Sequence, residues 1–132
     1  MRRVLAVLCG ITAVSMLVNV LYSAADPDTS LIIWNFVVDP AVLLFLGIAI
    51  VIHVRDSLQV RNEAGPHPTQ LPRDVITALE AIVLVRFLLQ YVYSLSPNLE
   101  PTPNLWEHLD ALLIVILAFE AIVLRRSAER TP

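Results

Sequence analysis

Four long apolar runs constrain the fold more than any other feature of the sequence. They cover about residues 4–24, 31–53, 75–95 and 109–124. A transmembrane helix needs about 20 predominantly apolar residues, so we expect each run to cross a bilayer. Backbone polar groups in lipid need partners within the segment, and no alternating strand pattern is present, so the runs should be helices. The sequence therefore predicts an all-α fold, an integral membrane four-helix bundle that forms one domain over residues 1–132.

The composition agrees with a membrane protein. Of the 132 residues, 57% are hydrophobic, whereas soluble domains average roughly 45–50%. The first run follows Arg2 and Arg3 and resembles a signal peptide. However, the run has about 20 residues and the apolar core of a signal peptide has about 7–15, so we expect a retained membrane anchor. The single cysteine, Cys9, excludes an intramolecular disulfide.

The positions of the arginines predict the orientation. All nine basic residues are arginine, which favours a GC-rich bacterial genome, and eight of them lie outside the apolar runs: Arg2, Arg3, Arg55, Arg61, Arg73, Arg125, Arg126 and Arg130. These eight precede the first run, separate the second from the third, or follow the fourth. By the positive-inside rule, both termini and one longer middle loop should be cytoplasmic in a plasma (inner) membrane, and the two short loops should lie outside. Arginines spread in this way form no basic stripe, so we expect no nucleic-acid partner.

Ionisable residues within the apolar runs are the candidate functional residues: Asp39, Glu80, Arg86 and Glu120. Each costs about 2.5–3.5 kcal/mol at the centre of a membrane helix unless it finds a partner or water. Asp39 and Arg86 fall at about the same depth when residues are counted from the ends of the runs. We therefore expect an ion pair between them, with Gln90 on the same face completing the hydrogen bonding of Arg86. Such a pair could fix the register of two helices or form part of a proton route.

Two further features carry open alternatives. Glu80 and Glu120 fall at a second common depth, where they could share a proton or face different neighbours. Pro40 should kink the second helix and free the carbonyl of Phe36. A kink of this kind can mark a binding site in a transporter, and it is also tolerated as plain structure in membrane helices.

The sequence gives no indication of a cofactor. His53 and His108 should lie at opposite membrane faces, so they cannot hold a haem together, and His67 fits a solvated loop. Glu107, His108 and Asp110 could form a polar cap at the outer face or supply one or two metal ligands. The sequence contains no phosphate-binding loop, no HExxH motif and no nucleophile elbow. We expect no catalytic, cofactor-binding or metal-binding residues in the chain.

Three functional hypotheses remain. The leading one is a non-catalytic accessory or structural subunit that packs against other membrane subunits and lipids, for example in a membrane-bound oxidoreductase or a transport assembly. It rests on the absence of a soluble domain and on more buried polar groups than one bundle should satisfy. The alternative is a small oligomeric transporter or channel whose route is lined by Asp39, Glu80, Arg86 and Glu120. A membrane enzyme with catalytic carboxylates ranks third.

Overall fold

The computed structural model contains four long helices in the residues that it describes. These residues are 1–23, 25–26, 30, 32–64, 71–95 and 103–129, and the side chains of Ala64 and of residues 103–108 are not described. The helices are α1 (Arg2–Ser23), α3 (Asp39–Ala64), α4 (Leu71–Ser94) and α5 (Pro103–Glu129), and a π-helical turn, η1 (Trp34–Val38), leads into α3. The all-α prediction is confirmed.

Three of the helical segments are long and apolar enough to cross a membrane. They are Arg2–Ser23, Trp34–Glu63 and Leu71–Ser94. The fourth expected run also forms a helix, α5, but this helix carries more charge, including Asp110, Glu120 and Arg125. A possible span is therefore supported for three of the four runs by length and composition.

The predicted middle loop is shorter than expected. The second apolar run ends at His53 and the third begins at Val75, so a loop was expected between them, but α3 continues to Ala64 and α4 begins at Leu71. Hydropathy marks where the apolar stretch ends, whereas a helix continues while its residues tolerate helical geometry. No glycine or proline lies between His53, where the apolar run ends, and Gly65, and Arg61 near the end of α3 pairs with Asp74 of α4 at 2.7 Å. His67 lies outside the described residues.

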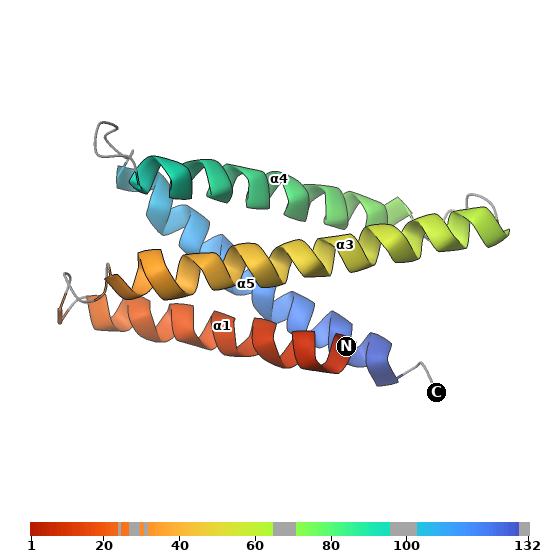
Figure 1. Cartoon of the computed structure of the whole chain (residues 1–132), viewed down its shortest axis with the longest axis horizontal. Helices are drawn as coiled ribbons and strands as arrows, with labels where there is room; N and C mark the ends of the chain where they lie inside the picture. The colour runs from red at the N-terminus through yellow and green to blue at the C-terminus, as the bar shows by residue number, and fades with distance from the viewer. Residues whose placement is uncertain (24, 27–29, 31, 65–70, 96–102, 130–132) are drawn as a thin grey trace.

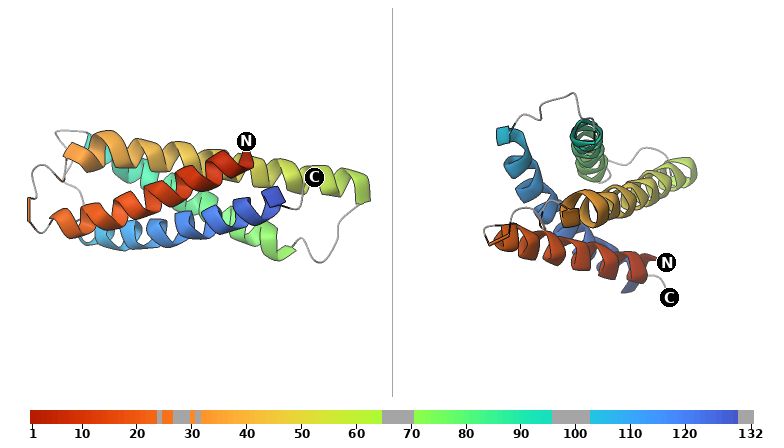
Figure 2. Two further views of the ribbon diagram at one scale, coloured as in Figure 1. Left: turned by 90° about the horizontal axis from the view of Figure 1, so that it is seen from below. Right: turned by 60° about the vertical axis from the view of Figure 1, so that its left-hand side comes forward.

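The helices pack as two pairs. α1 lies along α5, α3 lies along α4, and α4 and α5 make little contact (Figure 1). The start of α1 and the end of α5 lie at the same end of the bundle, together with the end of α3 and the start of α4 (Figure 2). Seven arginines belong to these helix ends, which we call the arginine-rich end: Arg2, Arg3, Arg55, Arg61, Arg73, Arg125 and Arg126.

The irregular turn before α3 follows from Pro40. The backbone N–H of Asp39 donates to the carbonyl of Trp34, five residues back, so it is not available to Asn35. The residue five positions after Asn35 is Pro40, which has no N–H. Tyr91 of α4 instead donates its hydroxyl to the Asn35 carbonyl at 3.0 Å. The π-helical turn therefore leaves the carbonyl of Asn35 for a partner on another helix, whereas the sequence predicted that the freed carbonyl would be that of Phe36.

Tyr91→Phe should lower the free energy of unfolding by about 1 kcal/mol, because the Asn35 carbonyl then loses its partner. Tyr93→Phe is the matched control, since Tyr93 is 42% exposed and has no hydrogen-bond partner in the described part of the chain. Thermal unfolding in detergent micelles measures both. In a Pro40→Ala background, residue 40 regains an N–H, so the effect of Tyr91→Phe should shrink. An equal loss for Tyr91→Phe and Tyr93→Phe would contradict this account.

Candidate functional site

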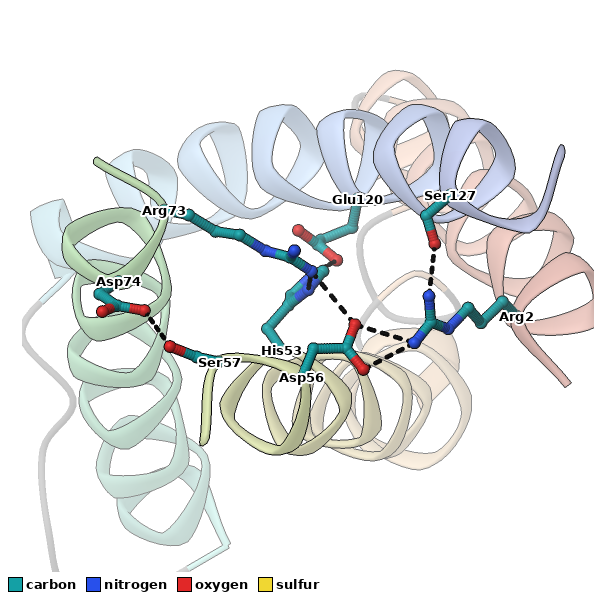
Figure 3. A network of polar contacts seen from close by, with 8 residues as sticks. All are labelled: Arg2, His53, Asp56, Ser57, Arg73, Asp74, Glu120 and Ser127. Carbon is teal, nitrogen blue, oxygen red and sulfur yellow. Dashed lines mark hydrogen bonds and ion pairs between the residues drawn. The ribbon is translucent and has the colours of Figure 1, made fainter. Parts of the chain in front are cut away.

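A network of polar side chains joins all four helices at the arginine-rich end (Figure 3). Arg2 of α1 donates from Nη2 to both carboxylate oxygens of Asp56 of α3, at 2.6 and 2.8 Å, and from Nη1 to Ser127 of α5 at 2.9 Å. Arg73 of α4 lies 3.3 Å from the same Asp56 carboxylate. One carboxylate thus binds two guanidinium groups, and the first turn of α1 is tied to the last turns of α5.

The network continues inward through His53. Arg73 lies 3.0 Å from His53 Nδ1, and His53 Nε2 lies 2.7 Å from Glu120 Oε2 (Figure 3). A guanidinium group has only donors, so Nδ1 must be the acceptor and must carry no proton. The imidazole is therefore the neutral Nε2–H tautomer, and Nε2 donates to Glu120. His53 is 5% exposed and Glu120 is 1% exposed, so this bond lies in the interior.

Glu80 completes the chain of contacts. Its carboxyl group is hydrogen-bonded to that of Glu120, and its Oε2 atom is buried with no partner in the part of the chain that the structure describes. Two carboxyl groups can share a hydrogen bond only when one of them carries a proton. The structure thus brings together Glu80 and Glu120, for which the sequence left open either a shared proton or separate neighbours. Glu80, Glu120 and His53 could hold and pass a proton.

The predicted ion pair between Asp39 and Arg86 does not form in the structure. Asp39 is 2% exposed, whereas Arg86 lies on the exposed side of α4, and no salt bridge joins them. Gln90 is buried and its Nε2 has no partner among the described residues, so it does not complete the hydrogen bonding of Arg86. The ionisable side chain that lies close to Asp39 is instead Asp110 of α5. Counting residues places Arg86 at the depth of Asp39, but it does not show on which side of α4 the Arg86 side chain lies.

Two polar clusters are separated by an apolar layer. Asp39, Gln90 and Asp110 lie in one half of the bundle, and His53, Glu80 and Glu120 lie in the other. Glu80 and Gln90 are ten residues apart on α4, as are Asp110 and Glu120 on α5, which is about 15 Å of helix. The fully buried side chains between the clusters include Val42, Leu46, Phe87, Leu113 and Leu117. In the described part of the chain, no continuous row of polar groups crosses this layer.

Other predicted features stay outside this site or outside the described residues. The side chains of Glu107 and His108 are not described, so the proposed outer cap or metal site is not tested. Within the described part of the chain, no group of three or more His, Cys, Asp or Glu side chains has an arrangement that could hold a metal ion. The contacts of His53, Asp56 and Arg73 were not predicted from the sequence, because these residues lie at or beyond the ends of the apolar runs. Comparison with protein-family models, curated proteins and solved structures finds no match to this chain.

Proposed function

We propose that the chain is an integral membrane protein that crosses the plasma (inner) membrane four times, with its arginine-rich end in the cytoplasm. Three helices have the required length and apolarity. The start of α1 and the end of α5 lie at one end, which fits an even number of crossings with α5 as the fourth span (Figure 1). The charge on α5 fits this assignment, because Glu120 is buried against the other helices and Asp110 is half-buried. The positive-inside rule then favours the cytoplasm for the arginine-rich end.

We propose further that the protein is a non-catalytic accessory subunit of a larger membrane assembly. Arg86 carries this proposal. It lies on the exposed side of α4, eight residues or about 12 Å from the end of the helix at Ser94, and it has no partner in the described part of the chain. A charge at that depth costs several kcal/mol in lipid, so it calls for a partner carboxylate. The partner is therefore a helix of another subunit that carries Asp or Glu at this depth.

The surface of α4 suits such a partner. α4 is the least buried of the three candidate spans and packs mainly on α3. Its exposed side chains near Arg86 are apolar: Leu79, Ile82, Val85, Leu89 and Val92. A second copy of the chain docked through α4 in symmetric fashion would bring two Arg86 side chains together, and like charges repel. A different chain is the better partner.

A proton transporter is the second candidate, and one observation favours it. Glu80 and Glu120 share a hydrogen bond at the floor of a cavity of about 590 Å³ that opens at the arginine-rich end. However, the apolar layer between the two polar clusters would have to open before a proton could cross. The accessory role needs no such movement.

Arg86→Leu should weaken the assembly more than tenfold while the amount of folded chain stays the same or rises. The partner carboxylate loses its counter-charge, at a cost of about 2–5 kcal/mol. The chain itself exchanges an unpaired charge for an apolar side chain. Arg125→Leu, at an exposed arginine of the helix end, is the control. A photo-crosslinker at Leu89 of α4 should capture one partner, and the capture should disappear in Arg86→Leu and persist in Arg125→Leu.

A crosslinker at Val14, on the exposed side of α1, shows whether capture is specific to α4. Equal capture from both positions, or capture that is independent of Arg86, would contradict the accessory role. The purified chain in liposomes that hold a pH-sensitive dye gives the opposing test. Proton flux that Glu80→Gln abolishes without loss of folded protein would establish the transporter instead.

A further inference from the structure

The cavity at the arginine-rich end has the features of a ligand site. It lies where α4 and α5 make little contact, and residues of α1, α3, α4 and α5 line it. Its volume of about 590 Å³ falls within the range of roughly 300–1,000 Å³ that is typical of small-molecule sites. Its wall divides into a basic rim, an apolar side and a floor that contains Glu80 and Glu120.

Three arginines from three helices form the rim. They are Arg2 of α1, Arg73 of α4 and Arg126 of α5. Arg2 and Arg73 share the carboxylate of Asp56, and Arg126 has neither an ion pair nor a hydrogen bond in the described part of the chain. Three cations with one anion among them leave the rim with a net positive charge. Guanidinium groups bind phosphate with two parallel hydrogen bonds, so this rim is suited to a phosphate group.

The side of the cavity is apolar and open. Ile76 of α4 and Phe119 of α5 are 42% and 44% exposed, and Val123 lies beside them in the wall. An apolar wall next to a basic rim matches an amphiphile whose phosphate lies at the end of a hydrocarbon chain. At the floor, the Glu120 carboxylate is already held by His53, and its charge keeps an anion at the level of the rim.

We propose that this cavity binds the phosphate headgroup of an anionic phospholipid, with an acyl chain along Ile76, Phe119 and Val123. The proposal rests on the membrane placement proposed above, with the arginine-rich end at the cytoplasmic face. Basic pockets between transmembrane helices on that face are known to bind anionic headgroups. The phosphate lies between Arg73 and Arg126, and Arg126 makes its main contact there. Inorganic phosphate could bind the same arginines, but it has no hydrocarbon chain to contact the apolar wall.

Arg126→Gln should weaken binding of dioleoyl phosphatidylglycerol about tenfold, as measured by native mass spectrometry of the detergent-solubilised chain. Arg125→Gln is the matched control: it removes the same charge one position earlier, but Arg125 does not line this cavity and pairs with Glu129 at 3.3 Å. It should leave binding unchanged. Dioleoyl phosphatidylcholine, whose phosphate is neutralised by its own ammonium group, should bind the unaltered protein at least tenfold more weakly.

Three results would overturn the proposal. An equal loss in Arg126→Gln and Arg125→Gln would mean that only the general positive field attracts the lipid. Full displacement of the lipid by inorganic phosphate would assign the site to the free ion. Equal binding of phosphatidylcholine would remove the requirement for an anion. Alkaline carbonate extraction of the same membranes tests the membrane placement separately, because release of all variants into the soluble fraction would refute the placement whatever the lipid does.

Discussion

Replacing His53 with leucine is expected to lower the free energy of unfolding by about 1.5–3 kcal/mol, because it leaves the buried Oε2 atom of Glu120 without its donor. The contact joins α3 to α5 at 2.7 Å between side chains that are 5% and 1% exposed. The measurement is thermal unfolding of the purified chain in detergent micelles, together with the yield of folded protein.

The double variant His53→Leu/Glu120→Leu should recover part of this loss, because it removes the charge together with its donor. Breaking a buried pair costs more than replacing both members with apolar residues. The exposed pair Arg125–Glu129 is the control, and Arg125→Leu should cost less than about 1 kcal/mol. Strictly additive losses for His53→Leu and Glu120→Leu would show that the two residues are not coupled. That result would contradict a hydrogen bond donated by His53 Nε2 to Glu120.

Phe87→Ala is expected to cost about 3–5 kcal/mol, because Phe87 is fully buried in the apolar layer between the two polar clusters. Removal of the ring leaves a cavity that the surrounding leucines can fill only in part. The measurement is again thermal unfolding in micelles.

Phe36→Ala is the matched control for Phe87→Ala. Phe36 is 71% exposed on the π-helical turn, so its ring contacts the surroundings in both the folded and the unfolded chain. Its loss should therefore cost less than about 1 kcal/mol. Similar costs at the two positions would mean that the layer is not tightly packed. It would then not block a polar route through the bundle.

Most contacts of the candidate site could not be predicted from the sequence, because they depend on how each helix is rotated about its axis. Counting residues gives the depth of a side chain, and on that basis Glu80 and Glu120 were placed at one level. The direction of a side chain around the helix axis depends on which face packs against a neighbour. Apolar residues occur on every side of α4, so the apolar residues alone do not show which face packs against the bundle. At about 100° per residue, Thr77, Glu80 and Phe87 fall on one stripe, and Arg86 falls roughly a third of a turn away from it.

A better signal was present in α4 itself. Thr77 and Glu80 are polar residues on one stripe of α4, about half a turn and a third of a turn from Arg86, and both are buried against the bundle. Had that stripe been used, Arg86 would have been assigned to the outer face, and the pair with Asp39 would not have been predicted. The network of Arg2, Asp56 and Arg73 carried no comparable signal, because charges at the ends of apolar runs are the ordinary pattern of any membrane helix.

The sequence by itself determined the helices. The length of each apolar run, the absence of helix breakers within most of them and the grouping of arginines at alternate connections follow from local chemistry, and the structure has the corresponding helices with the start of α1 and the end of α5 at one end. Only the tertiary structure decided how each helix is rotated and how far it extends beyond its apolar run. Helix rotation and helix length bring His53 into contact with Glu120 and place Arg2, Arg73 and Arg126 around one cavity. Helix rotation also places Arg86 on the exposed side of α4. Rotation and length depend on packing between segments distant in sequence, which no local pattern encodes.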